Sequence, residues 1–502
     1  MLNTKKILFL LFISVSILIL YYPALFTYFS QDDFFHFKIS QSDGSLGGFI
    51  KLFGFYPFEE RGIAFYRPLF REALYFSYYN FFGLNHIPFR LLSFSILIIN
   101  SALVYSFLQK LLKNVRISLF SAFFYAISAS NVATLYYLAG GIQAIGATLF
   151  ILICLLLFLN FLETKSRKKL ILSFFTFLLA LASHELAAVL PLLLLGLTFL
   201  YIPRKDVKNF LIFLVPFILV LAVYMSLEVF LIGFSSQEKQ YQVALSFKTF
   251  INTFSWYSAW ALGLPEMLID FVSPGLKLKP ALMQYWGNYF LIIFPTFFIS
   301  LCMISSAGLY LFWKQRRLLI NKQFLFLLFW FPLGIFPVIF LPLHKSTYYL
   351  NPVLPAFWGT IGFLIFNAHS LLRKKYSLIA NILLIITLAS FFYLSFASAK
   401  LGAETYWAST RGKLAHKLLD GIRNKYPTLP KGAIISLKND PNHPFIAKEW
   451  GGSAKQASFI LNGSDALQLL YNDATIKVFY EGQDAVFEKS SAQIYEFVVE
   501  IY

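Results

Sequence analysis

The sequence predicts an α-helical protein that crosses a membrane many times, and three observations lead to this prediction. Hydrophobic residues make up 58% of the 502 residues and charged residues only 13%, whereas a soluble protein carries roughly a quarter charged residues. Apolar segments of about the length that spans a bilayer recur along the chain. Lysine and arginine are concentrated in the short connections between these segments.

The basic residues determine the expected orientation. The formal net charge is +18, but the cations form short clusters between apolar segments, which is typical of cytoplasmic connections in membrane proteins. We therefore expect a cytoplasmic N-terminus and no nucleic-acid partner. The clusters are Lys5 and Lys6; Lys110, Lys113 and Arg116; and the segments 165–169, 204–208, 314–322 and 373–375.

Hydropathy predicts eleven transmembrane helices, a number that places every basic cluster inside and the C-terminus outside. Because no obvious small-residue cleavage site follows the first apolar segment, we expect it to be a retained signal anchor in the plasma membrane. The expected spans are 7–27, 91–109, 117–137, 144–162, 170–183, 186–202, 209–233, 287–313, 323–342, 352–372 and 376–398.

The predicted organisation is a transmembrane domain over residues 1–398 and a small extracytoplasmic α/β domain over 399–502. Two long outer loops, 28–90 and 234–286, interrupt the spans and are rich in aromatic residues, which favour the headgroup region of a bilayer. Within the first, the segment from Ala64 to Phe82 is expected to be a helix in the interface.

The C-terminal segment changes character and is nearly charge-balanced. Helical spacing over 414–422 predicts a helix, and strands are expected at 433–437, 475–480 and 494–502. This segment has no residues with catalytic spacing, so we expect it to position an acceptor or to cover a cavity.

Polar residues that are unusual at membrane boundaries fall on the outer face of this topology. Ionisable residues at membrane depth are costly and usually line a cavity or pair with one another. A carboxylate there could take a proton from an attacking hydroxyl, and cations could stabilise a departing phosphate. These parts suit glycosyl transfer from a polyprenyl phosphate sugar. The residues are Asp32, Asp33, Arg67, Asn131, Gln143, His184, Glu185, His344, Lys345, Tyr348 and Tyr349.

The order of these motifs resembles the GT-C membrane glycosyltransferases, especially the protein O-mannosyltransferase and aminoarabinose transferase group. The similar features are an acidic pair after the first span, Tyr66-Arg67-Pro68-Leu69 in the outer loop, and the segment GLNHIPFRLLSFSILIINSALVY at 83–105. The later SHELAAVLP (183–191) is similar to that group's Lys-Glu motif, and HKSTYYLNPVLPAF (344–357) to its final outer loop. The resemblance covers about residues 1 to 400 and implies the GT-C fold.

Position by position, the resemblance implies that Asp32 is a base or an acceptor-binding carboxylate, with Asp33 beside it. Glu185 matches the Glu of the Lys-Glu motif, while His184 stands in place of the Lys. In the last outer loop Tyr348 matches the Tyr, and Thr347 stands where the group has Arg, so Lys345 is expected to supply the missing charge.

The site prediction therefore names Asp32 and Asp33 as catalytic and six residues as substrate-binding: Arg67, His184, Glu185, His344, Lys345 and Tyr348. Transfer by direct attack would invert the anomeric configuration, with a donor lipid and an extracytoplasmic protein, lipid or glycan acceptor as partners. The acidic pair could hold a divalent cation, but its ligand count is low, so neither a metal site nor a cofactor is assigned.

Each of these residues also has a simpler interpretation. The acidic pair could cap a helix or be solvated in a loop, Arg67 could reach toward lipid headgroups, and His184 with Glu185 could form a polar turn between two spans. Lys345 could be an ordinary membrane anchor. A transporter or flippase for a lipid-linked or small polar solute is the alternative function, although no internal repeat of the kind common in transporters is evident.

Overall fold

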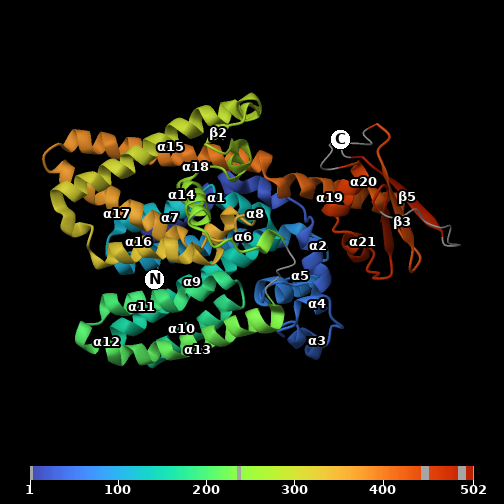
Figure 1. The fold of residues 1–502 in the computed structure, drawn as a ribbon, viewed down its shortest axis with the longest axis horizontal. Helices are drawn as coiled ribbons and strands as arrows, with labels where there is room; N and C mark the ends of the chain where they lie inside the picture. Colours follow the sequence, from blue (N-terminus) through green and yellow to red (C-terminus); the bar gives the residue numbers. More distant parts are fainter. Residues whose placement is uncertain (1–3, 234–238, 443–450, 484–492, 501–502) are drawn as a thin grey trace.

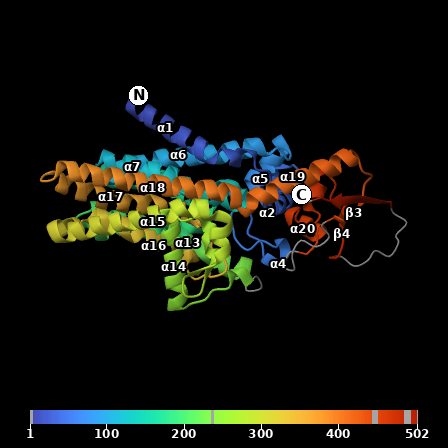
Figure 2. The ribbon, with the colours of Figure 1, turned by 90° about the horizontal axis from the view of Figure 1, so that it is seen from above.

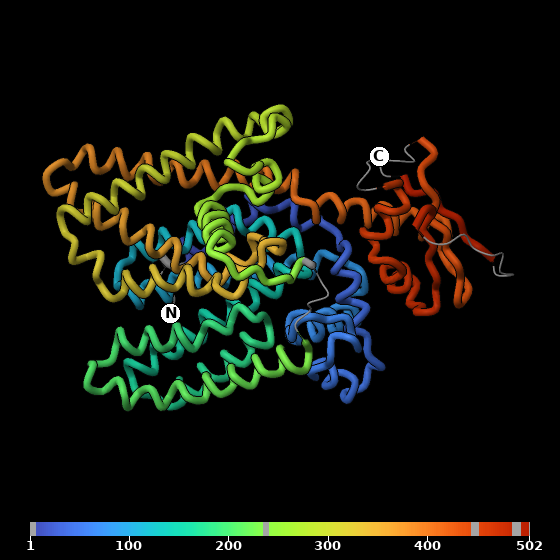
Figure 3. Tube along the Cα trace, in the orientation of Figure 1, coloured from blue at the N-terminus to red at the C-terminus, as the bar shows by residue number. Residues whose placement is uncertain are grey.

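A computed structural model of the chain describes residues 4–233, 239–442, 451–483 and 493–500. Long helices run side by side in an elongated body, and a smaller part containing a sheet lies at one end of it (Figure 1). The first outer loop, drawn in blue, lies between the helical body and this C-terminal part in Figure 3.

The longer helices of the body are α1 (Thr4–Tyr21), α6 (His86–Leu112), α7 (Val115–Ala126), α9 (Leu138–Thr164), α10 (Arg167–Leu181), α11 (Leu190–Tyr201), α13 (Val215–Ser226), α14 (Phe247–Leu262), α15 (Pro280–Gln315), α16 (Lys322–Ile335), α17 (Leu354–Arg373) and α18 (Ser377–Thr405). Shorter helices are α2 (Asp32–Ile39), α3 (Leu46–Lys51), α4 (Phe58–Arg61), α5 (Leu74–Phe82), α8 (Asn131–Tyr136) and α12 (Arg204–Leu211).

Six helical segments among the described residues are long and apolar enough to cross a membrane, so the chain is a multi-pass membrane protein. A helix also lies in each of the eleven expected spans; the number that cross the bilayer stays a prediction. The six segments are Ile7–Phe26, His86–Leu112, Leu138–Thr164, Arg204–Gly233, Pro280–Leu318 and Ser377–Lys425.

Several basic connections gather at one end of the body. The α11–α12, α15–α16 and α17–α18 connections lie at the left end in Figure 1, whereas the C-terminal part lies at the right end. This arrangement is the one expected if these connections share one side of a membrane.

The expected span 117–137 is interrupted, which corrects the prediction of one continuous helix. α7 ends at Ala126 and α8 begins at Asn131. The Asn131 side-chain amide donates to the carbonyl oxygens of Tyr125 (2.9 Å) and Ala126 (3.1 Å), which satisfies two acceptors that a helix end leaves open. Hydropathy did not reveal this break because the polar residues at it, Ser128, Ser130 and Asn131, are few, buried and flanked by apolar segments.

The outer loops are only partly helical. The interfacial helix expected from Ala64 begins at Leu69, as a π-helical turn (η2, Leu69–Ala73) that continues into α5. The second loop contains α14, the 3-10 helix η7 (Glu266–Phe271) and a two-stranded hairpin of β1 (Val272–Ser273) and β2 (Lys277–Leu278). Figure 2 shows α14 projecting from the side of the helical body.

The C-terminal part has a parallel sheet of order β4-β3-β5. The expected boundary at 398 falls inside α18, and Tyr406 separates α18 from α19. Buried residues of the sheet and α19 share one hydrophobic cluster with Phe29, Phe34 and Tyr75 of the first outer loop. The elements are β3 (Ile434–Asn439), β4 (Lys477–Tyr480), β5 (Ile494–Val499), α19 (Trp407–Lys425), α20 (Ser453–Ile460) and α21 (Asp465–Leu470).

Candidate functional site

A polar cavity of about 220 Å³ lies at the end of the helical body next to the C-terminal part. Four of the residues expected at the site line it: Asp32, Arg67, His344 and Tyr348. The cavity walls come from α2, the segment before η2, the start of α9 and the loop before η10 (Thr347–Leu350). Other residues in its wall are Phe35, His36, Phe58, Gly62, Ile63, Ala64, Phe65, Arg71, Tyr137, Ala139, Gly140, Gln240 and Tyr241.

Asp32 is the carboxylate of the pair that faces this cavity. It is the first residue of α2, and its Oδ2 accepts a hydrogen bond from the Tyr137 hydroxyl. Burial raises the pKa of Asp32 above its ordinary value, against the lowering effects of Tyr137 and Arg411. A raised pKa makes its carboxylate a stronger base once it has lost its proton.

Asp33 faces the protein interior instead and does not line the cavity. It is 2% exposed, and its oxygens accept hydrogen bonds from the Ser30 backbone N–H (3.1 Å) and the Tyr75 hydroxyl (2.9 Å). Burial raises the pKa of Asp33 to about 6, and the positive charge of Arg90 opposes this effect. These contacts fix the chain at the start of α2. For Asp33, therefore, the simpler interpretation holds, in which an acidic residue stabilises the start of a helix.

Arg90 supports the same segment from α6. It is fully buried and donates to four backbone carbonyls, those of Thr27, Tyr28, Leu135 and Tyr136. Arg90 therefore links the segment before Asp32 to the end of α8, which is next to Tyr137.

Arg67 is held by residues that were expected to act beside it. Its guanidinium makes a two-pronged contact with Glu185, at 2.8 Å from Nε and 2.5 Å from Nη2, and Nη1 donates to Gln143 (2.8 Å). A paired contact of this kind fixes both position and orientation. Glu185 and His184 do not line the cavity; they lie behind Arg67.

His184 is fully buried beside this pair. Its Nδ1 accepts the Leu186 backbone N–H, and its ring meets Tyr349 edge-on at 5.7 Å between centroids. Burial lowers the pKa of His184, as does the neighbouring charge of Arg67. A neutral histidine at this position cannot replace the charge of the lysine that the resemblance implies here.

The loop before η10 brings His344 to the cavity, η10 itself brings Tyr348, and Lys345 of the loop points elsewhere. Lys345 does not line the cavity; its Nζ donates to Asn252 Oδ1 of α14 (2.8 Å). The loop is held by Glu266, whose Oε2 accepts from the Thr347 backbone N–H and hydroxyl, both at 2.6 Å, and from the Ser346 hydroxyl at 3.1 Å. Burial raises the pKa of Glu266.

Asn252 belongs to a wide apolar groove of about 810 Å³. Its walls are α14, η7, the β1–β2 hairpin and the middle of α15. A second apolar cavity of about 600 Å³ shares Ser255, Ala259 and Phe297 with it. The segment 344–348 therefore contacts both the polar cavity and the edge of an extended apolar surface.

α19 of the C-terminal part forms the layer behind Asp32. Arg411 donates to the Gln31 side chain and stacks over Trp407, with 4.8 Å from Cζ to the ring centroid. Trp407 in turn contacts the Tyr137 ring at 4.9 Å. The backbones are close, because a Cβ at Gly412 would lie 2.6 Å from the Tyr28 carbonyl oxygen.

Gln31 lies in a backbone conformation that side chains rarely adopt, with φ 50° and ψ −111°. Its N–H donates to the Ile460 carbonyl of α20 (2.7 Å). A strained backbone conformation persists where the surrounding structure stabilises it. Here the hydrogen bond to Ile460 of the C-terminal part stabilises the residue directly before Asp32.

Sequence reasoning missed several residues of this site. Tyr137 and Gln31 are uncharged and so did not stand out from their surroundings in the sequence. Arg411 and Glu266 are charged but lie far along the chain from the motifs considered. His36 and Arg71 line the cavity within or near those motifs, and two of their buried nitrogens, His36 Nδ1 and Arg71 Nε, have no hydrogen-bond partner within the described structure. Among the described residues, no three His, Cys, Asp or Glu side chains are grouped to hold a metal ion.

No protein-family model and no curated protein matches this chain. Among the solved structures that match is the crystal structure of the apo form of the Archaeoglobus fulgidus oligosaccharyltransferase, with a TM-score of 0.48 and 11% sequence identity. The matched region covers 95% of this chain and 65% of that one, so this chain spans about two thirds of that protein's length. Similarity of this extent carries no functional inference by itself.

Proposed function

We propose that this chain is a membrane glycosyltransferase of the GT-C type. It transfers a sugar from a polyprenyl-phosphate-linked donor to an acceptor outside the cytoplasm, which is a protein, a lipid or a cell-surface glycan. The observation that carries the proposal is the segment 344–348: its His344 and Tyr348 line the polar cavity that contains Asp32, and its Lys345 contacts Asn252 of the wide apolar groove. A sugar on a long isoprenoid lipid needs both environments next to each other.

In the proposed reaction Asp32 accepts the proton of the acceptor hydroxyl as its oxygen attacks the anomeric carbon. The bond between that carbon and the phosphate oxygen breaks, and the phosphate leaves with the bonding electrons. Because the attack is direct, the anomeric configuration inverts. General-base catalysis of this kind typically contributes ~10²–10⁴-fold.

Charge stabilisation of the leaving phosphate comes from cations at the cavity and its edge. Arg67 and Arg71 line the cavity, but Arg67 shares its charge with Glu185, and Arg71 pairs with Glu72 at 2.7 Å. Lys345 has no carboxylate within salt-bridge distance among the described residues and sits at the edge of the apolar groove through Asn252. We therefore assign Lys345 the main contact with the donor phosphate and Arg67 and Arg71 a supporting one.

The apolar groove takes the isoprenoid chain in this proposal. Its lining includes Phe247, Leu276 and Phe298, which are 80%, 84% and 60% exposed. Exposed apolar side chains of this size suit a surface in contact with lipid. Tyr137 and Tyr348 would pack against the sugar in the cavity, where Tyr137 also orients Asp32.

Two measurements test the proposal. Cells that lack the protein should accumulate a lipid-linked sugar, measured by mass spectrometry of extracted lipids. When that lipid is incubated with the purified full-length protein, its sugar should be transferred to an acceptor. The purified Asp32→Asn variant should not carry out this transfer. A transporter or flippase would instead move the lipid or solute unchanged, so accumulation without any sugar transfer by the purified protein would contradict the proposal.

A further inference from the structure

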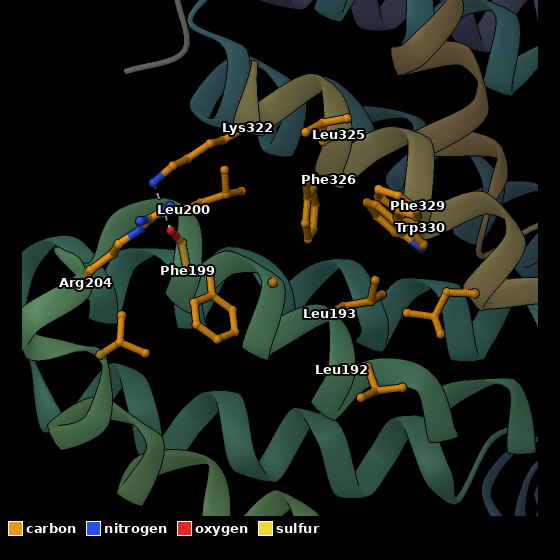
Figure 4. Close-up of a pocket in the computed structure, with 13 residues that line it drawn as sticks. Leu192, Leu193, Phe199, Leu200, Arg204, Lys322, Leu325, Phe326, Phe329 and Trp330 are labelled. Atoms are coloured by element: carbon orange, nitrogen blue, oxygen red, sulfur yellow. Dashed lines mark hydrogen bonds between the residues drawn. The ribbon is translucent and has the colours of Figure 1, made fainter. Parts of the chain in front are cut away.

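A further groove, at the opposite end of the helical body, takes no part in the proposed reaction. It is a cavity of about 360 Å³ between α11 and α16. Figure 4 shows leucine, phenylalanine and tryptophan side chains from both helices facing it. This volume lies within the usual range of small-molecule sites, roughly 300–1,000 Å³.

Two cations stand at one end of this groove. Arg204 is the first residue of α12 and Lys322 the first of α16, and Figure 4 shows both side chains beside the Phe199 carbonyl oxygen. Lys322 Nζ donates to that oxygen at 3.4 Å. No Asp or Glu in the described part of the chain lies within 4 Å of either cation. Their positive charge is therefore available to an external anion.

The apolar part of the groove opens toward the side of the body. Leu192, Phe199 and Phe329 line it and are 52%, 51% and 65% exposed. In a membrane this surface faces the acyl chains. The groove thus joins a hydrocarbon environment to two cations at the end where the basic connections gather.

We propose that this groove binds one anionic glycerophospholipid, with an acyl chain between α11 and α16 and the phosphate between Arg204 and Lys322. Basic pockets between transmembrane helices on the cytoplasmic side are suited to anionic headgroups. The site is separate from the donor groove, which is formed by α14 and α15. A bound lipid there connects the α9–α13 helices to α16.

The test measures lipid binding by the full-length protein in a neutral detergent, using native mass spectrometry. The protein should retain about one molecule of phosphatidylglycerol. It should retain phosphatidylglycerol in preference to phosphatidylcholine with the same acyl chains. The double variant Arg204→Gln/Lys322→Gln should weaken phosphatidylglycerol binding roughly 25-fold, about fivefold for each cation. A matched control, Arg316→Gln/Arg317→Gln, removes two exposed charges at the same end of the body and should retain binding.

A second variant tests the apolar part without changing charge. Gly196 lines the groove, and a Cβ there would lie 3.1 Å from the Phe326 ring, so Gly196→Leu narrows it and should also weaken phosphatidylglycerol binding. Equal retention of the two lipids by the unaltered protein would overturn the proposal. So would an equal loss in the control, which would indicate a general charge effect. The lipid comparison uses only the unaltered protein, so it decides the matter even where a variant fails to fold.

Discussion

At the scale of single residues, Asp32 and Asp33 are neighbours with opposite surroundings. Asp32 faces the cavity and Asp33 faces the interior, so amide substitutions at the two positions should differ in effect. Asp32→Asn should lower sugar transfer by ~10²–10⁴-fold, while Asp33→Asn, the matched control, should act through stability. Single-turnover transfer by purified variants measures this; normal transfer by Asp32→Asn would remove that residue from the mechanism.

The pKa of Asp33 gives a second prediction at this scale. Its pKa is about 6 in the folded protein against an ordinary 3.8, so the folded state binds its proton more tightly. The resulting stability is fully present below pH 3.8 and is lost as the pH rises through 6, and the difference corresponds to about 3 kcal/mol.

The measurement is thermal unfolding of the unaltered protein and of Asp33→Asn between about pH 4 and about pH 7, which brackets the titration of this carboxyl. The difference in thermal stability between the unaltered protein and Asp33→Asn should become less favourable to the unaltered protein as the pH rises across this interval. The reason is that the carboxyl of Asp33 titrates and the amide of the variant does not. An advantage that grows with pH would mean that the folded protein lowers, rather than raises, the pKa of Asp33.

At the scale of elements, α19 is the feature that changes the interpretation of the C-terminal segment. That segment was expected to be accessory, yet its Arg411 and Trp407 lie directly behind Gln31 and Tyr137. The positive charge of Arg411 lowers the pKa of Asp32. We therefore assign Arg411 a positioning role at the proposed catalytic base.

Replacing Arg411 with Gln should shift the acid side of the pH–rate profile upward, by up to about one pH unit. The sign follows because loss of a nearby cation favours the protonated form of Asp32, so activity is lost at a higher pH. Lys413→Gln is the control, since Lys413 is exposed on the same helix. A lower rate with an unchanged profile would assign Arg411 a purely structural role.

At the scale of the whole molecule, the orientation in the membrane gives a further prediction. A reporter active only outside the cytoplasm should work when fused after Tyr502, and a cytoplasm-only reporter should work in the connection after Lys374. The expectation rests on the basic connections at one end of the body. The reverse pattern of activities would place the polar cavity in the cytoplasm and exclude an extracytoplasmic acceptor.

Some of this architecture could be predicted from the sequence for a physical reason. Lipid forces a spanning segment to be apolar and to satisfy its own backbone, so the helical segments are visible in hydropathy. Polar residues stand out against them, which is why Asp32, Arg67, His344 and Tyr348 were all identified and line one cavity.

The rest depends on contacts between distant parts of the chain. Arg411 reaches Gln31 across 380 positions, and no local pattern records that approach. The different surroundings of Asp32 and Asp33 arise from the direction of α2 against Tyr75 and Tyr137. Glu266 supports the 344–348 loop from a segment with no motif of its own.

The shared hydrophobic cluster has a consequence for how the protein is made. Phe29 and Phe34, next to Asp32, pack in one cluster with Val499 of β5, although synthesis of these residues is separated by nearly the whole chain. Contacts between distant residues form late, because long loops must close first. The segment 28–90 is synthesised early, but its packing is complete only after β5 has been synthesised. A partly synthesised chain should therefore form the groove proposed for the donor lipid before the proposed base, Asp32, is held in place, so nascent protein should bind lipid without transferring its sugar.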